Sequence, residues 1–328
     1  MSYGFRNTLR DAYPSAPELT EKDYPDLTGK TFLVTGTSAG VGQQAARLLL
    51  SKNATVVTVN RNLAKTEAAT KVIIDDLISA DSTLTDDKIR SRLIQIQADL
   101  ADLTTIKPAV SNISNAVSQL DTVILNAGVM QPPLGSLTKQ GYELQFGANV
   151  MGHQLLLDLI TPLVQKSAKS GNTPRVIFTT SLSHSLSPPN GGLTWDFTNP
   201  TIVQGQTLYG QSKTGNIYQA AMYAEQYKNV ISLAVHPGFL NSDLQRDMPL
   251  PSFVLNFMKK AIFYPPVYGA YTELWAALNP KITQQDSGRY VAPWGQFRDL
   301  RDDVEKGKTN GTAKKMLDWV EKEIEQYK

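Results

Sequence analysis

The chain has 328 residues, of which 41% are hydrophobic and 19% charged, and its formal net charge is +2. This balance is typical of a soluble globular protein and excludes a strongly basic nucleic-acid-binding surface or a polybasic membrane surface. The sequence has no cysteine, which excludes disulfides and thiolate metal sites and fits a reducing compartment. Because the N-terminus lacks the apolar core of a secretory signal and no stretch reaches the about 18 apolar residues of a membrane span, we expect a cytoplasmic protein.

Residues 1–27 are polar and rich in proline, and we predict an arm that leads into the first strand. Beyond the arm, short β-branched runs alternate with helical stretches. The predicted strands are 31–35, 55–59, 93–97, 122–125, 175–179, 230–235 and 289–292. The predicted helices are 41–51, 62–80, 102–119, 141–168, 207–227, 266–278 and 312–326, and 82–92 is an insertion or a helix extension. This order predicts an α/β fold: a doubly wound, mostly parallel, seven-stranded sheet with helices on both faces.

We expect a single domain over 28–300, followed by a helical tail at 301–328. Two segments, 182–206 and 236–265, are too long to be simple connections. Both follow predicted strands at the edge where open α/β sheets bind ligands, so they are candidate substrate loops. The apolar and aromatic middle of the second loop suggests a lipophilic substrate, while packed core or a dimer surface is an equal alternative. Residues 251–264 also have a pattern compatible with peripheral contact to a membrane or lipid droplet.

Residues 31–42 predict a strand, a glycine turn and the start of a helix, which is the context that makes a glycine fingerprint meaningful. Gly36 can take a positive φ, Gly40 allows a pyrophosphate to approach the backbone, and Gly42 allows the helix to pack close to the strand. The helix N-terminus then offers unpaired N–H groups to phosphates. With Ser38 and Val41, these glycines form the predicted cofactor-binding turn.

Tyr209 and Lys213 stand four residues apart, on one face of a predicted helix. A nearby ammonium favours phenolate, so we expect Lys213 to lower the pKa of Tyr209 and make it a general acid or base. Such a pair arises by chance in a chain of this composition. Its position after the fifth strand, downstream of the glycine turn, gives it meaning.

Several motifs, in this order and at this spacing, make the chain resemble the short-chain dehydrogenase/reductase family, which has a Rossmann-type fold. The resemblance covers about residues 28–295 and rests on the stretches 35–42, 99–100, 126–128, 209–213 and 236–238, with Asn149 and Ser181. It is strongest to the retinol-dehydrogenase-like branch, which includes fungal members, through 60–62, 209–216, Ser242 and 290–294.

The resemblance implies a role for each matching residue. Tyr209 would exchange a proton with the substrate oxygen, and Ser181 would hydrogen-bond that oxygen. Lys213 would bind the nicotinamide ribose, and Asn149 would hold a water that links Lys213 to solvent. The remaining cofactor contacts are Asp99 with Leu100 at the adenine, Asn126, Ala127 and Gly128 at the end of the fourth strand, and Pro237 and Gly238 on the nicotinamide side.

Some assignments have alternatives. Ser183, Ser185 and Ser187 compete with Ser181, which is preferred because it lies where the fifth strand ends. Asp99 has a second interpretation as a helix N-cap, although Asp102 fits that role better. The three histidines (His153, His184 and His236) lie in separate segments without metal-ligand spacing, so no metal site is expected.

The residues after the second strand favour NADP(H) over NAD(H). An NAD site usually has an acidic residue about 20 positions past the glycines. Here that place holds Asn60 and Arg61. Asn60 removes the charge that would repel a 2′-phosphate, and Arg61 can bind one in bidentate fashion. Ala39 counts against this assignment, because NADP-using relatives often carry a basic residue there.

We therefore predict an NADP(H)-dependent oxidoreductase that interconverts a lipophilic aldehyde or ketone and its alcohol. The alternative is a nucleotide-sensing or scaffold protein that kept the fold and lost the chemistry. The expected partners are a small carbonyl or alcohol substrate and, by resemblance only, a second copy of the chain bound through helices 141–168 and 207–227.

Overall fold

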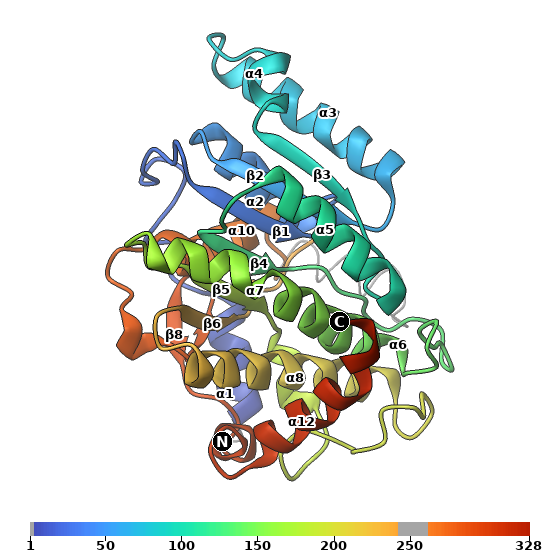
Figure 1. Cartoon of the computed structure of the whole chain (residues 1–328). Coiled ribbons are helices and arrows are strands. Elements are labelled where there is room, and N and C mark those ends of the chain that lie inside the picture. The colour runs from blue at the N-terminus through green and yellow to red at the C-terminus, as the bar shows by residue number, and fades with distance from the viewer. Residues whose placement is uncertain (1–2, 242–261) are drawn as a thin grey trace.

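The computed structural model describes residues 3–241 and 262–328, with side chains from residue 7 onward (Figure 1). Its centre is an eight-stranded sheet with the order β3-β2-β1-β4-β5-β6-β7-β8. All neighbouring strands are parallel except β7 and β8. The strands are β1 Thr31–Thr35, β2 Thr55–Asn60, β3 Leu93–Gln97, β4 Thr122–Leu125, β5 Arg175–Thr179, β6 Ile231–Val235, β7 Tyr290–Ala292 and β8 Gln296–Arg298. The winding reverses between β1 and β4, so a crevice outside their carboxyl ends is the expected ligand site.

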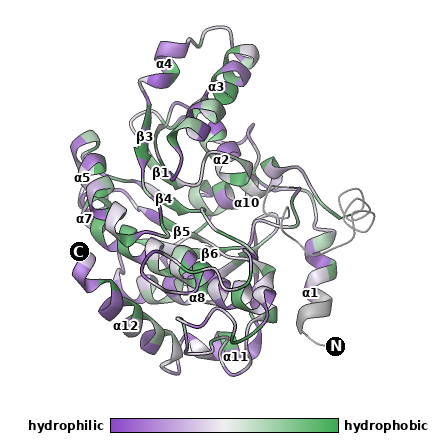
Figure 2. Ribbon diagram, turned by 90° about the vertical axis from the view of Figure 1, so that its right-hand side faces the viewer, coloured by the Kyte–Doolittle hydropathy of each residue, from purple (hydrophilic) through white to green (hydrophobic). Residues whose placement is uncertain are grey.

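Helices cover both faces of the sheet, as predicted. One layer holds α5 (Ile106–Ala116), α7 (His153–Lys169) and α8 (Gly205–Gln226), and the other holds α2 (Gly40–Ser51), α3 (Leu63–Ala80) and α10 (Pro266–Leu278). Strand side chains alternate between the layers: Leu33 packs with the first, and Phe32 and Val34 pack with the second. The fold therefore has two hydrophobic cores, one on each face, and hydrophilic residues dominate peripheral elements such as α4 (Figure 2).

The structure differs from the sequence-based expectation in several short elements. The sheet has eight strands rather than seven, because the three-residue β8 adds an antiparallel edge strand. The N-terminal arm contains a helix, α1 (Tyr3–Ala12), and 82–92 contains the short helix α4 (Asp86–Arg90). The predicted helix 141–168 begins later, with α6 (Leu144–Phe146), and continues through the π-helical turn η2 (Gly147–Gly152) into α7.

Both ends of the chain pack onto the domain. In the arm, Glu18 accepts hydrogen bonds from the Trp275 indole at 3.2 Å and from Lys281, while Glu21 pairs with Arg47 on α2. At the other end, α11 (Asp302–Gly307) and α12 (Thr312–Ile324) contribute apolar side chains to the same core as α7 and α8. The predicted tail is therefore an integral layer, and α12 lies along α8 and α7 (Figure 1).

Within the described parts of the chain, no helix combines the length and apolar character needed to cross a bilayer. Residues 251–261, the greater part of the stretch considered for membrane contact, lie outside the described residues.

Candidate active site

The turn between β1 and α2 has the geometry expected of the glycine fingerprint. Gly36 has φ +75° and Gly40 has φ +62°, a region that favours glycine. A Cβ added at Gly42 would lie 2.4 Å from the Gly36 carbonyl oxygen, so only glycine lets α2 approach β1 this closely. Ala39, at the N-cap, provides no side-chain cap, which leaves the first N–H groups of α2 available to an anion. The turn therefore fits a bound pyrophosphate.

At the end of β2, the structure gives Asn60 and Arg61 different surroundings. Asn60 is buried; its Oδ1 accepts from the Thr37 N–H at 2.7 Å, and its Nδ2 donates to the Thr37 hydroxyl at 2.8 Å. Asn60 therefore holds the glycine turn in place. Arg61 is exposed directly beside it, where its guanidinium can meet a charged ligand.

The end of β4 is tied to the glycine turn. The Asn126 amide donates to the Thr35 carbonyl at 2.9 Å, and the Ala127 N–H donates to the Thr35 hydroxyl at 2.9 Å. A Cβ on Gly36 would lie 2.9 Å from the Cα of Ala127. The two strands on either side of the winding reversal are thus locked together at their carboxyl ends.

Asp99 and Leu100 follow β3 in a turn that leads to the helical region before α5. The Asp99 carboxylate accepts from the Ala101 N–H at 3.0 Å, and Asp102 caps the next turn by accepting from the Thr104 N–H. The N-cap assignment of Asp102 is confirmed. The Leu100 carbonyl lies against Gly152 of η2, so this turn is also fixed in position.

Tyr209, Ser181 and Lys213 come together where β5 ends. Tyr209 and Lys213 are buried on α8, and the Lys213 Nζ lies 5.6 Å from the centroid of the Tyr209 ring. Ser181 begins the turn after β5, and its side chain hydrogen-bonds Tyr209. A Cβ on Gly210 would lie 2.5 Å from the Ser183 carbonyl oxygen, so this glycine lets the serine loop pack against α8. The three predicted side chains form one cluster.

The electrostatics of this cluster differ from the sequence-based expectation. Burial raises the pKa of Tyr209 above its usual range, and the hydrogen bond with Ser181 lowers it only in part. Burial also lowers the pKa of Lys213, while the carboxylate of Glu273 raises it. The expectation that Lys213 lowers the pKa of Tyr209 was wrong for this structure, because burial of the phenol is the dominant influence and Ser181 is the group that opposes it. Tyr209 is therefore a protonated phenol at neutral pH.

Asn149 lies in the π-helical turn η2 and is fully buried. Its amide group accepts from the Val129 N–H at 2.8 Å and donates to the Val129 carbonyl and the Ser212 hydroxyl. A Cβ on Gly128 would lie 3.2 Å from the Asn149 Oδ1 and 3.5 Å from the Lys213 Nζ. Gly128, Asn149 and Lys213 therefore meet around one small space.

Asn216 is a residue of this network that had no assigned role. Its Nδ2 donates to the Asn149 carbonyl at 2.7 Å, and its Oδ1 accepts from the Lys213 Nζ at 3.2 Å. The sequence signal was its position three residues after Lys213, one helical turn along α8. The Asn216 side chain thus connects the Lys213 ammonium group to the backbone of Asn149.

The two candidate substrate loops are described to different extents. The first is held by Arg301, whose guanidinium donates to the carbonyls of Ser185, Ser187 and Pro188. In the second, Pro237 lies near Gly269 of α10 beside Val41, and Gly238 has φ +97°. The predicted Pro237 and Gly238 therefore lie near the start of α2, and residues 242–261 of this loop lie outside the described residues.

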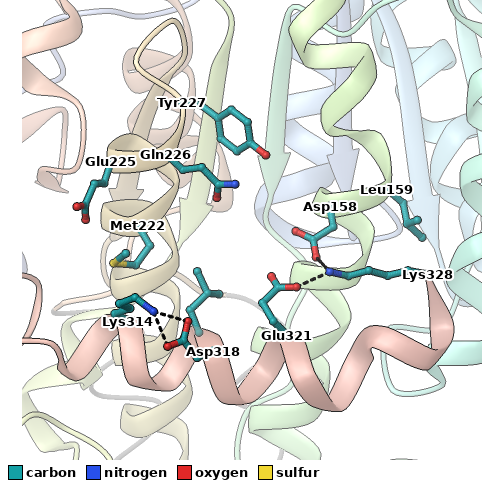
Figure 3. Close-up of a pocket in the computed structure, with 11 residues that line it drawn as sticks. Asp158, Leu159, Met222, Glu225, Gln226, Tyr227, Lys314, Asp318, Glu321 and Lys328 are labelled. Carbon is teal, nitrogen blue, oxygen red and sulfur yellow. Dashed lines mark hydrogen bonds and ion pairs between the residues drawn. The ribbon is translucent and has the colours of Figure 1, made fainter.

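A groove of about 590 Å³ lies elsewhere, between α7, α8 and α12 (Figure 3). In it, the Lys328 Nζ pairs with Asp158 at 3.0 Å and also with Glu321. Burial and the neighbouring Glu321 raise the pKa of Asp158. Met222 in the groove is 13 residues from Tyr209, about 20 Å along α8, so the groove is separate from the tyrosine cluster.

The comparisons with known proteins agree with this geometry. A family model described as short chain dehydrogenase matches residues 30–192. A short-chain dehydrogenase/reductase from Phomopsis amygdali is 33% identical over 99% of both chains, and pkfC, a short-chain dehydrogenase/reductase from Emericella nidulans, is 35% identical over 95% of this chain and 97% of its own. In fold, the chain is similar to RhlG from Pseudomonas aeruginosa, solved as an NADP active-site complex, with a TM-score of 0.60 and 21% identity over 84% of this chain and 96% of RhlG.

Proposed function

Because this chain belongs to the short-chain dehydrogenase/reductase family, we propose that it is an NADP(H)-dependent reductase of lipophilic aldehydes or ketones, with Tyr209 as the general acid. The observation that carries the proposal is the convergence of Tyr209, Ser181, Lys213 and Asn149 at the carboxyl end of β5. A protein that only binds a nucleotide has no need of all four.

The protein's own residues have defined tasks in this reaction. The bound cofactor supplies the hydride that reduces the carbonyl carbon. The Tyr209 hydroxyl donates its proton to the carbonyl oxygen, and the Ser181 hydroxyl holds that oxygen by a hydrogen bond. Because burial raises the pKa of Tyr209, the phenol carries the proton that the reducing direction needs.

We assign cofactor recognition to the residues that follow β1 and β2 and to Lys213 on α8. The glycine turn and the N-terminus of α2 would hold the pyrophosphate, and Lys213 would hold the ribose next to the nicotinamide. Exposed Arg61, at the end of β2, supports NADP(H) because it can pair with a 2′-phosphate where an acidic residue would repel one. The apolar and aromatic residues in the sequence of the loop 236–265 support an apolar substrate.

The test is Tyr209→Phe, assayed by NADPH oxidation with a panel of aldehydes and diketones. We expect kcat/KM to fall by about 1,000-fold, while NADPH affinity, measured by fluorescence, changes less than about threefold. The matched control is Tyr218→Phe on the same helix, which loses only the bond from its hydroxyl to the Gly191 carbonyl and about 1 kcal/mol of stability. Undiminished reduction by Tyr209→Phe contradicts the proposal. A wild-type protein that binds NADPH but reduces no carbonyl of the panel would be a nucleotide sensor.

A further inference from the structure

Glu273 is a fully buried carboxyl group in the middle of α10 that the proposed reaction does not use. Its Oε1 accepts a hydrogen bond from the Thr179 hydroxyl at 2.7 Å. Its Oε2 is buried and has no hydrogen-bond partner. A buried carboxyl group with one unsatisfied oxygen is costly, so some other interaction must favour its presence.

Thr179, the last residue of β5, connects Glu273 to the catalytic cluster. The Thr179 hydroxyl donates to Glu273, and the Thr179 carbonyl accepts from the Lys213 Nζ at 2.9 Å. The helices that carry the two charged groups, α8 and α10, pack on opposite faces of the sheet (Figure 1). Their side chains therefore reach the carboxyl end of one strand from the two sides and meet on one residue.

The charges in this region are few. Burial raises the pKa of Glu273 and lowers the pKa of Lys213, and the opposite charge of the partner reduces each shift without cancelling it. The other titratable groups near Lys213 are Tyr209 on α8 and His153 at the start of α7. Burial lowers the pKa of His153 to about 4, so it is neutral at neutral pH. Lys213 and Glu273 are thus each other's main source of charge stabilisation.

Arg175 is a further charged group on β5, which packs against α10, and its guanidinium hydrogen-bonds groups other than Glu273. It stands at the opposite end of β5 and donates to the carbonyls of Ala276 and Asn279. Glu273 therefore faces Lys213 as its cationic neighbour at the carboxyl end of the strand.

We infer that Glu273 is a positioning residue for Lys213: anchored by Thr179, its negative charge favours the ammonium form of Lys213, whose burial favours the neutral amine. The inference rests on the proposed role of Lys213 in holding the cofactor ribose. Glu273 touches neither substrate nor cofactor in this scheme. It acts through the charge of Lys213.

Glu273→Gln tests the inference, because glutamine retains an oxygen for the Thr179 hydroxyl and removes only the charge. The probe is NADPH, and its dissociation constant is measured by fluorescence between pH 5.5 and 9.5. Without the carboxylate the pKa of Lys213 falls, so Lys213 loses its proton at lower pH. We expect NADPH affinity to begin its fall at alkaline pH about one pH unit lower in Glu273→Gln than in the wild type. In this falling part of the pH profile, the alkaline limb, NADPH then binds about tenfold more weakly than to the wild type.

Three further variants make the result decisive. Thr179→Val, which removes the anchor of Glu273 but keeps the carbonyl for Lys213, should shift the limb in the same direction and serves if Glu273→Gln does not fold. In Lys213→Met the limb should be absent, and adding Glu273→Gln should then change nothing. The matched control is Glu143→Gln: Glu143 is also buried, but it accepts from the N–H groups of Gln145 and Phe146 at the start of α6, so its loss should lower stability and leave the limb in place.

A Glu273→Gln profile that superimposes on that of the wild type overturns the inference, as does a loss of affinity that is equal at every pH. Neither result bears on the reductase assignment, because turnover by Tyr209→Phe is measured separately. Conversely, a failed Tyr209→Phe test would leave the linkage of Lys213 and Glu273 measurable by NADPH binding alone.

Discussion

The two halves of the candidate site are built by different means. At the glycine turn between β1 and α2, the structure depends on missing side chains, since a Cβ at Gly36 or Gly42 would overlap backbone or the Asn126 amide. At the end of β5, the structure depends on hydrogen bonds of buried polar side chains: the Asn216 side chain accepts from Lys213 and donates to the backbone carbonyl of Asn149. Steric fit is the more demanding constraint in the first half and polar pairing in the second, so the two halves should fail differently when altered.

The largest expected effect on cofactor binding is in the steric half. In Gly42→Ala the added methyl group would lie 2.4 Å from the Gly36 carbonyl, so the turn must open. We expect the free energy of unfolding, measured by urea denaturation, to fall by about 1–3 kcal/mol. We also expect NADPH affinity to fall about 100-fold, because opening the turn removes about 2–3 kcal/mol of binding free energy. Gly205→Ala is the matched control, because nothing lies within 4 Å of an added Cβ at the start of α8. Wild-type NADPH affinity in Gly42→Ala would contradict steric control of this half.

The polar half offers a sharper test in two neighbouring serines, read in turnover and not in cofactor binding. Ser181→Ala removes the hydroxyl that bonds Tyr209, and we expect kcat/KM for carbonyl reduction to fall by about 100-fold with little change in NADPH affinity. The Ser183 hydroxyl only accepts from the Ser181 hydroxyl, at 3.2 Å, so Ser183→Ala should lower kcat/KM less than about threefold. If Ser183→Ala is as severe as Ser181→Ala, the assignment of the substrate-binding hydroxyl to Ser181 is wrong.

The same contrast explains what could be predicted from the sequence. Glycine spacing and the alternation of strand and helix are local signals, so β3 and α10 occupy the residues predicted for them. The edge strand β8 was missed because Gln296, Phe297 and Arg298 give no apolar run, and it is fixed instead by pairing with β7.

Polar pairing across the sheet leaves no local signal. Glu273 and Thr179 are 94 residues apart, and Arg301 is 114 residues from the Ser187 carbonyl it binds, so neither contact could be predicted from spacing. The pKa of Tyr209 was mispredicted for a related reason. Sequence gives the distance along the helix to Lys213, whereas the shift depends on how completely the fold removes water from the phenol.

The smallest expected effect concerns the boundary of the steric half, at the residues proposed to select the cofactor. Both the oxygen and the nitrogen of the Asn60 amide hydrogen-bond Thr37, so exposed Arg61 is the candidate partner of a 2′-phosphate. In Arg61→Ala we expect the preference for NADPH over NADH, measured as the ratio of their dissociation constants, to fall about tenfold, because one charge-assisted contact is worth about 1.5 kcal/mol. Lys65→Ala removes another exposed cation, at the start of α3, and should change the ratio less than about threefold. Equal effects of the two variants would assign the preference to the general positive field around α3, and the specific contact with Arg61 would be wrong.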